Sequence, residues 1–284
     1  MVVRIRPKLL LIPALILSLL LSALLGGSAL RAGTAPREET RLPILMYHSV
    51  CVNPRANSEY VLPPERFRAD MEYLKAHGYT TVFFSEVLAY ARGAGELPEK
   101  PVAITLDDGF LNALTEVLPV LETLDMKAEI NLVGDYCLQE ENAEYRSPAY
   151  SYLNKEEIGE LRASGRFEFG SHTFAMHGLA DRRGCAQKPG ESDADYAAAL
   201  NGDLRRMEAE LLAPCGIKTG IFAYPFGAYG ENTKKLLVEA GFEILLTCEE
   251  RVNLIYPGAE LTGLGRFHRA ASLTTEEFME KTGL

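Results

Sequence analysis

The stretch PVAITLDDG at residues 101–109 carries the strongest signal for the fold. Residues 101–106 are almost entirely apolar, which is typical of a parallel strand covered on both faces. Asp107 and Asp108 follow at once, and Gly109 permits the turn that would let both carboxylates reach one site. The carboxyl ends of barrel strands face the active site, so the stretch predicts a strand that ends at a site. Alternatively, Asp-Asp-Gly is a turn that caps a helix beginning near Phe110.

Short apolar runs alternate with amphipathic stretches along the rest of the chain. Asn154 with Glu157 and Thr274 with Glu277 form capping boxes. The alternation predicts βα units, and their number favours a distorted (β/α) barrel of about seven parallel strands, with an open doubly wound sheet as the alternative. Candidate strands are 42–47, 79–84, 101–106, 128–133, 166–171, 219–224, 242–247 and 264–268, and candidate helices are 64–76, 85–92, 110–124, 154–164, 192–212, 230–240 and 274–282.

Residues 1–32 differ from the rest of the chain. Arg4, Arg6 and Lys8 precede an almost purely apolar run at 9–25, and small residues follow it. This order predicts a cleaved signal peptide or, since the run approaches the length of a membrane span, an N-terminal membrane anchor. Either route places the remainder outside the cytoplasm, secreted or anchored to the cell membrane by this segment alone. A polar linker at 33–41 and a single domain at 42–284 are expected to follow.

The charge balance limits the partners. The formal net charge is −10, and it becomes −14 without residues 1–32, because they hold four cations and no acid. Nucleic-acid binding depends on Lys and Arg that neutralise phosphates, so we expect no nucleic-acid partner. The five cysteines are scattered, and their odd number and spacing indicate no disulfide framework. We expect a monomer.

A second chemical signal is GSHTFAMH at residues 170–177, again at the end of a predicted strand. His172 and His177 can bind one ion only if the strand ends at His172 and the chain curls before His177. The alternative is one hydrogen-bonded structural histidine and one surface histidine. Two imidazoles and a carboxylate at strand ends suit a divalent metal, zinc by default, with nickel, cobalt or iron also compatible. A second carboxylate beside the metal would be free to act as a general base.

With these motifs the chain resembles the polysaccharide deacetylases of the NodB-homology (carbohydrate esterase 4) type, over essentially all of residues 42–280. Residues 107–109 match the family's Thr-Phe-Asp-Asp-Gly motif, with Leu106 in place of Phe. His172 and His177 match its His-Ser/Thr-x-x-His motif with one extra residue between them, a spacing similar to the poly-β-1,6-N-acetylglucosamine deacetylase branch. FAYPFG at 222–227 resembles the third motif. The resemblance implies a NodB-type barrel and makes 42–284 the catalytic domain.

The resemblance also implies roles for individual residues. Asp108, His172 and His177 would hold the metal, and Asp107 would be the general base. The backbone N–H of Phe226, which follows the proline of the third motif, would bind the oxyanion.

Two roles depart from the family's common pattern. Most members take the general acid from a C-terminal Leu-x-His motif, but this chain reads Leu-Gly-Arg at 264–266. In the poly-glucosamine branch a His near the N-terminal end of the domain serves instead. ILMYHS at 44–49 therefore implies His48 as the acid, with His268 as the second candidate. The Arg that orients the base has no counterpart before Pro225, and Arg266 is its candidate replacement.

The sequence thus predicts an exported, metal-dependent hydrolase that removes N-acetyl groups from an N-acetylglucosamine-containing polysaccharide and releases acetate. The polysaccharide would be an exopolysaccharide or a cell-wall glycan. Two alternatives stay open: a deacetylase or esterase acting on peptidoglycan or chitin-like oligomers, and an exported carbohydrate-binding pseudoenzyme. A complete Asp/Asp/His/His set argues against the pseudoenzyme, because binding alone requires no carboxylate beside a metal.

Overall fold

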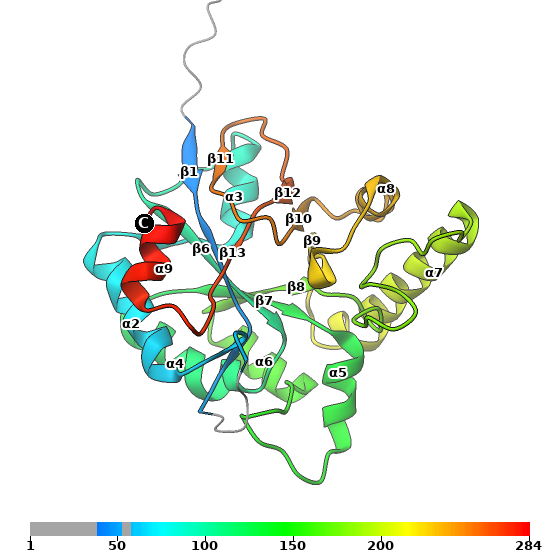
Figure 1. Ribbon diagram of the computed structural model, residues 1–284, viewed down its shortest axis with the longest axis horizontal. Coiled ribbons are helices and arrows are strands. Elements are labelled where there is room, and N and C mark those ends of the chain that lie inside the picture. The colour runs from blue at the N-terminus through cyan, green and yellow to red at the C-terminus, as the bar shows by residue number, and fades with distance from the viewer. Residues whose placement is uncertain (1–38, 53–57) are drawn as a thin grey trace, which may run out of the picture. The chain divides into compact units, whose positions relative to one another are not determined.

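The computed structural model describes residues 39–52 and 58–284, and Glu39–Leu284 is one compact unit. The predicted signal peptide or anchor at 1–32 and most of the predicted linker lie outside the described residues. The unit is an α/β fold in which a parallel sheet curls on itself and helices surround it (Figure 1). The prediction of a distorted barrel of parallel strands is therefore confirmed.

The main sheet of the described residues has nine strands, and all of its pairs are parallel. Its order is β12-β10-β9-β8-β7-β6-β2-β13, and β5 pairs with β6 beside this path. Two short pairs flank the sheet: β1 with β11, antiparallel, and β3 with β4, parallel. The strands are β1 (Thr40–Leu42), β2 (Ile44–Tyr47), β3 (Ser49–Val50), β4 (Val61–Leu62), β5 (Thr80–Thr81), β6 (Pro101–Asp108), β7 (Ala128–Leu132), β8 (Phe167–Ser171), β9 (Ile221–Ala223), β10 (Ile244–Leu246), β11 (Asn253–Ile255), β12 (Thr262–Leu264) and β13 (Phe267–His268).

Two helices begin at the capping boxes that the sequence predicts. The Asn154 side chain accepts from the N–H of Glu157 at 3.0 Å, and the Thr274 side chain accepts from that of Glu277 at 3.2 Å, so both predicted capping boxes are confirmed. The α-helices are α2 (Pro64–Ala76), α3 (Phe84–Ala91), α4 (Leu118–Leu124), α5 (Gly134–Gln139), α6 (Lys155–Ala163), α7 (Asp193–Arg206), α8 (Glu231–Glu239) and α9 (Thr275–Thr282). Shorter π- or 3₁₀-helical segments are η2 (Ala113–Val117), η3 (Glu140–Asn142), η4 (Met207–Leu212) and η5 (Pro225–Gly227).

The two edges of the main sheet are joined by a very short piece of chain. β12 and β13 lie at opposite edges, yet only Gly265 and Arg266 separate them. A Cβ at Gly265 would lie 2.5 Å from the carbonyl oxygen of Glu249, so a larger residue does not fit at this crossing. The predicted single strand at 264–268 is therefore wrong. The backbone leaves one edge of the sheet and enters the other within that stretch, which places Arg266 at the seam of the barrel.

Other predicted boundaries also differ from the structure. The predicted strand 79–84 is shortened to β5 because α3 already begins at Phe84. Residues 40 and 41 belong to β1 rather than to the linker. The predicted helices 110–124 and 192–212 each contain a π-helical segment, η2 and η4. The short helix α5 was missed because six residues carry too little helical periodicity.

Alternate strand residues belong to two different cores. Leu45 and Ile104 pack in the cluster that includes side chains of α2, α4 and α6, whereas Ile44 and Ala103 pack in a second cluster with α3. The second cluster also holds Ile221, Ala223, Ile244, Leu246 and Leu264 from neighbouring strands. Since successive strand residues point to opposite faces, this second cluster is the apolar filling of the barrel.

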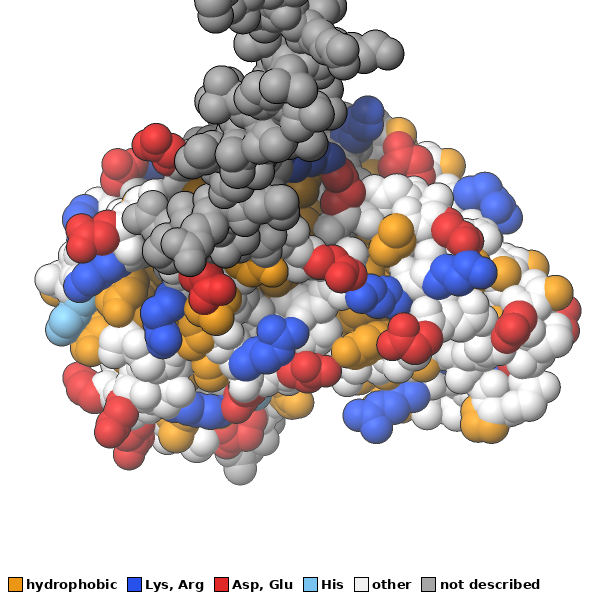
Figure 2. All heavy atoms as spheres, turned by 90° about the horizontal axis from the view of Figure 1, so that it is seen from above, with side chains coloured by type: hydrophobic (Ala, Val, Ile, Leu, Met, Phe, Trp, Pro, Cys, Tyr) orange, Lys and Arg blue, Asp and Glu red, His pale blue; other side chains and the backbone are white. Residues whose placement is uncertain are grey.

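The surface agrees with an acidic, mixed-charge domain. On the face seen in Figure 2, acidic and basic side chains are interspersed over the visible surface. All five cysteines are free, in agreement with the absence of a predicted disulfide framework. Within residues 39–52 and 58–284, no helix has both the length and the apolar character that crossing a membrane would require.

Candidate metal and catalytic site

The end of β6 turns both aspartates toward one cavity. Asp108 has φ 74° and Gly109 has φ 77°, so two successive residues adopt the left-handed conformation. A Cβ at Gly109 would lie 2.9 Å from Leu132 Cδ2, so glycine is needed here for space as well as for conformation. Asp107 and Asp108 both line a cavity of about 640 Å³ at the carboxyl end of the sheet. The predicted turn after the strand is present.

The chain also curls between the two predicted histidine ligands. β8 ends at Ser171, and Thr173 has φ 73°. The two carboxylate oxygens of Asp203 accept the backbone N–H groups of Phe174 and Ala175, each at 2.7 Å. These two hydrogen bonds from α7 stabilise the turn that places His177 beside His172.

Asp108, His172 and His177 converge on one point. Asp108 Oδ1 lies 3.2 Å from His177 Nε2 and 3.7 Å from His172 Nε2, and one atom from each residue lies within 4.8 Å of the others. Zinc binds nitrogen and oxygen ligands at about 2.0–2.2 Å, so one ion placed between these atoms would contact all three after small adjustments. Asp108 Oδ1 is buried and has no hydrogen bond of good geometry.

Hydrogen bonds at the other ring nitrogens leave both Nε2 atoms free to bind a metal. His172 Nδ1 lies 2.8 Å from the carbonyl oxygen of Ala223, which can only accept, so Nδ1 carries the hydrogen. The Tyr136 hydroxyl donates to the carbonyl oxygen of His177 at 3.2 Å and therefore accepts from His177 Nδ1, also at 3.2 Å. Partners of this kind orient metal-binding histidines. The residues present thus fit a divalent metal.

The electrostatics of the three residues agree with that use. Burial lowers the pKa of His172 to about 4, so its imidazole is neutral and able to bind a metal at neutral pH. Burial alone would raise the pKa of Asp108, but the neighbouring His177, His48 and His172 lower it. The set therefore combines one ionised carboxylate with a neutral His172 ligand.

Asp107 is paired with a buried arginine rather than with the histidines. Arg266 Nη1 and Nη2 donate to the two oxygens of Asp107 at 2.7 and 2.9 Å, and Asn131 Nδ2 donates to Asp107 Oδ1 at 2.9 Å. Arg266 is fully buried, and it also donates to Thr247 O and Thr105 Oγ1. Burial opposes ionisation of Asp107, but the charges of Arg266 and of the neighbouring histidines outweigh it and hold the pKa of this carboxyl well below its usual range.

His48 and His268 lie in the same cavity. Their ring centroids are 5.7 Å apart, and the ring of Tyr60 lies 4.8 Å from His48 and 4.6 Å from His268. His48 Nδ1 and His268 Nε2 are buried without a hydrogen-bond partner. Burial, together with His48, lowers the pKa of His268 to about 4. Both candidates for the general acid are thus near Asp107 and Asp108 in space.

Phe226 also lines the cavity. It has φ 58° inside η5, and its ring centroid lies 4.6 Å from that of His177. The left-handed conformation is uncommon for a residue with a large side chain and marks a strained turn.

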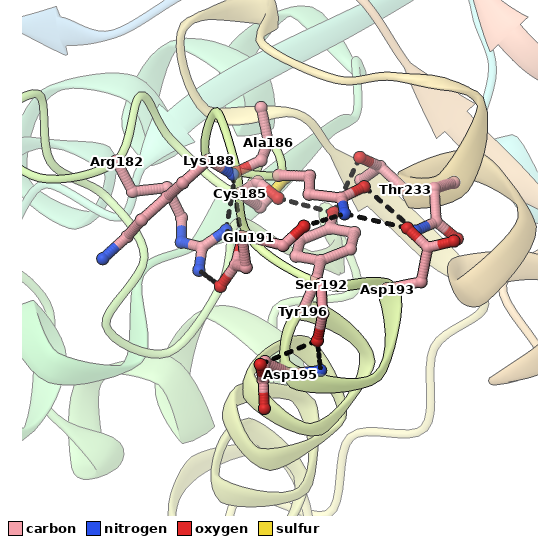
Figure 3. A network of polar contacts seen from close by, with 12 residues as sticks. Arg182, Cys185, Ala186, Lys188, Glu191, Ser192, Asp193, Asp195, Tyr196 and Thr233 are labelled. Atoms are coloured by element: carbon pink, nitrogen blue, oxygen red, sulfur yellow. Dashed lines mark hydrogen bonds and ion pairs between the residues drawn. The ribbon is translucent and has the colours of Figure 1, made fainter.

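A polar network holds the cavity wall that follows His177 (Figure 3). Arg182 pairs with Glu191 inside the loop 178–192, and the Tyr196 hydroxyl donates to the carbonyl oxygen of Cys185 at 2.7 Å while lying 2.7 Å from Thr233 Oγ1 of α8. At the centre of the loop, a Cβ on Gly184 would lie 2.5 Å from the carbonyl oxygen of Pro225. The loop is therefore fastened both to α7 and α8 and to the turn that carries Phe226.

Sequence reasoning missed several residues that support this site: Tyr136, Asp203, Glu129 and Asn131. Tyr136 and Asp203 act from helices distant in sequence, and no local signal marks them. Glu129 and Asn131 did leave a signal, because they are polar residues at alternate positions of the otherwise apolar run AEINLV. Two polar side chains on one face of a buried strand indicate a polar patch inside the sheet.

The protein is thus an α/β protein with a curled parallel sheet. An Asp/His/His cluster that could hold a metal ion lies at the carboxyl ends of its strands. A family model described as "Polysaccharide deacetylase" matches residues 94–245, more than half of the chain. The chain belongs to the polysaccharide deacetylase family. The matched range includes Asp107, Asp108, His172, His177 and Phe226. His48, Arg266 and His268 lie outside it, and the tertiary structure places them beside the matched motifs.

Relatives and solved structures agree with this membership. The chain is 27% identical to YxkH of Bacillus subtilis over 213 residues (74% of this chain, 65% of YxkH), so it spans less than two thirds of that relative. It is 22% identical to the poly-beta-1,6-N-acetyl-D-glucosamine N-deacetylase of Staphylococcus epidermidis over 209 residues (74% and 68%). The structure of IcaB from Ammonifex degensii matches with TM-score 0.68 and 25% identity (86% and 96% covered). A de-N-acetylase from Aggregatibacter actinomycetemcomitans matches in fold with TM-score 0.72 and 20% identity (85% and 99% covered).

Proposed function

We propose that this protein is a metal-dependent hydrolase that removes N-acetyl groups from an N-acetylglucosamine-containing polysaccharide and releases acetate. One observation carries the proposal: a carboxylate held by a buried arginine, Asp107, lies in the same cavity as the Asp108/His172/His177 cluster. A metal-binding protein without catalysis would not need that second carboxylate. The name of the Staphylococcus epidermidis relative supports an N-acetylglucosamine polymer as the substrate.

Each residue has a proposed part in the reaction. A divalent metal bound by Asp108, His172 and His177 would polarise the acetamide carbonyl and favour ionisation of water. Asp107 would take a proton from the attacking water at a carboxylate oxygen. The backbone N–H of Phe226 would donate to the oxygen of the tetrahedral carbon. His48 would give its proton to the departing amine, so that acetate and a free amino sugar leave.

We propose His48 rather than His268 as the acid. A proton donor must be charged before the amine departs, and the low pKa of His268, caused by burial and then by His48, keeps that ring neutral at neutral pH. Arg266 is proposed to orient the base, since it holds both oxygens of Asp107. This is the role for which the sequence suggested Arg266.

The remaining proposals concern the metal and the setting of the enzyme. Zinc is proposed because two imidazoles and one carboxylate suit it, and nickel, cobalt or iron would suit the same ligands. Residues 1–32 are proposed to export the protein, either as a cleaved signal or as a membrane anchor. The domain would then act on a glycan outside the cytoplasm, as a monomer.

The test is acetate release from N-acetylglucosamine oligomers with added zinc, with and without a chelator, using Asp107→Asn as the matched control. Acetate release that the chelator abolishes and the control lacks is the expected result. Running β-1,6-linked oligomers beside chitin-like oligomers, peptidoglycan fragments and an acyl ester identifies the substrate. Binding of oligomers without release of acetate from any of these substrates would instead favour a carbohydrate-binding protein.

A further inference from the structure

A buried carboxyl group lies inside the barrel and has no partner. Glu129 of β7 is almost completely buried, and neither of its carboxyl oxygens has a hydrogen bond. Asn131, two residues further along the same strand, is also buried, and its Oδ1 lacks a partner as well. Because the two residues alternate along the strand, both side chains lie on the same face of the sheet as Asp107.

A glycine on the next strand leaves the space that these two unpaired oxygens occupy. Gly170 of β8 pairs with Asn131, and a Cβ on Gly170 would lie 2.3 Å from both Asn131 Oδ1 and Glu129 Oε1. The two oxygens therefore lie over the same glycine, separated by at most twice that distance. An unpaired buried polar group is costly, so two buried acceptors that face the same point are stabilised if one of them carries a hydrogen and donates it to the other.

The amide of Asn131 cannot supply that hydrogen. Its Nδ2 donates to Asp107 Oδ1 at 2.9 Å, and this bond fixes which end of the amide points toward Glu129. The remaining group that can carry a hydrogen is the carboxyl of Glu129 itself.

The charges around Glu129 also favour its neutral form. Glu168 of β8 and Asp107 of β6 are acidic. Within residues 39–52 and 58–284, the cation that acts on Glu129 is Arg266, and its guanidinium already donates to both oxygens of Asp107. Burial, and after it Glu168, raises the pKa of Glu129 well above its usual value. Burial raises the pKa of Glu168 as well, but Glu168 accepts the backbone N–H groups of Phe84 and Ser85, which act in the opposite direction, whereas Glu129 accepts no such bond.

We propose that Glu129 is held in its protonated form and donates its hydrogen to Asn131 Oδ1, so that Glu129 and Asn131 together fix the position of the Asp107 carboxylate. Glu129 is a positioning residue. It contacts neither the substrate cavity nor the metal ligands, and it acts only through Asn131. Its effect on catalysis rests on the proposed deacetylase function, whereas its protonation does not.

The protonation is tested by unfolding, without any substrate. In the unfolded chain a glutamate loses its proton near pH 4.3, whereas folded Glu129 keeps it, so the native state binds more protons above that pH. Stability from this group is present at low pH and is lost as pH rises toward the folded pKa. From about pH 5 upward, the urea midpoint of the unchanged protein should therefore fall more steeply with pH than that of Glu129→Gln. The difference between the two slopes of the unfolding free energy should correspond to the release of up to one proton per molecule on unfolding. Identical pH dependence of the two proteins would overturn the proposal.

The positioning role is tested by kcat and KM on an N-acetylglucosamine oligomer. Glu129→Gln keeps a donor in the same place, so its kcat should stay within about threefold of the unchanged protein. Glu129→Met leaves Asn131 Oδ1 unpaired, and its kcat should fall at least about tenfold with an unchanged KM, since small misplacements of a catalytic group are costly. Equal kcat values for the Gln and Met variants would refute the positioning role. Absence of acetate release by the unchanged protein would instead refute the proposed function, and the unfolding comparison would still decide the protonation.

Discussion

Replacing Arg266 with Met isolates the interaction that holds the proposed base. The guanidinium is fully buried and makes two hydrogen bonds to Asp107, at 2.7 and 2.9 Å. Methionine preserves most of the apolar volume of the side chain but removes the charge and every donor. The variant therefore leaves Asp107 as a buried carboxylate with Asn131 as its remaining side-chain hydrogen-bond donor.

The expected loss of stability is large. Removing one partner of a buried ion pair costs roughly 3–5 kcal/mol, because the other charge stays buried and uncompensated. If that charge is the cause, Asp107→Asn added to Arg266→Met should recover part of the loss. The double variant should thus be more stable than Arg266→Met alone, although it carries one more substitution.

Urea unfolding at neutral pH measures these differences, with Lys235→Met as the matched control. Lys235 pairs with Glu239 on the exposed face of α8 at 3.8 Å, and both side chains are more than half exposed. Loss of an exposed helix pair of this kind costs no more than about 0.5 kcal/mol. Arg266→Met should also lower acetate release by about 10²-fold, because Asp107 is no longer held in place, while the metal content stays unchanged.

Two outcomes would refute this reasoning. A loss of stability in Arg266→Met no larger than that in Lys235→Met would show that the pair with Asp107 contributes nothing to the folded state. A double variant less stable than Arg266→Met would show that the uncompensated charge of Asp107 is not the cause of the lost stability. In the second case Arg266 would have to stabilise the domain through its bonds to Thr105 and Thr247 instead.

The other predictions concern the metal, the base, the acid and one glycine. His172→Ala and His177→Ala should each abolish zinc binding in a folded domain, and a full metal equivalent in both variants would contradict the ligand assignment. Asp107→Asn should keep the metal and lower kcat by roughly 10²–10⁴-fold, as removal of a general base does; simultaneous loss of the metal would make Asp107 a ligand. His48→Gln should lower kcat and remove or displace the alkaline limb of the pH–rate profile. His268→Gln should leave that limb unchanged, because burial and then His48 lower the pKa of His268 to about 4 and its ring is already neutral. The reverse pattern would identify His268 as the general acid. In urea unfolding, Gly184→Ala should destabilise the domain by at least about 1 kcal/mol more than Gly190→Ala. Both glycines have positive φ, but of the two only Gly184 faces a close backbone atom, Pro225 O. Equal losses of stability would show that the loop does not pack against Pro225 at this point.

Local sequence signals were sufficient for much of the fold. The apolar run at 101–106, the carboxylates after it and the capping boxes at Asn154 and Thr274 depend on interactions within a few residues. The turns at Gly109 and before His177 could also be predicted, because the paired carboxylates and the paired histidines can each share one site only if the chain turns there. Strand ends were less accurate: β5 is shorter than predicted and β1 begins inside the predicted linker, since their lengths depend on which neighbours they pair with.

The sequence by itself determined that Asp107, Asp108 and His172 stand at the ends of strands, and that these side chains suit a divalent metal. Only the tertiary structure decided which groups surround them. Arg266 reaches Asp107 from 159 positions away because the chain crosses the barrel seam there, and Asp203 bends the histidine segment from a helix that packs beside it. Asn131 and Glu129 become neighbours of Asp107 through strand register. Such contacts depend on closure of the sheet, and closure is a property of all its strands together, so no local stretch of sequence records it.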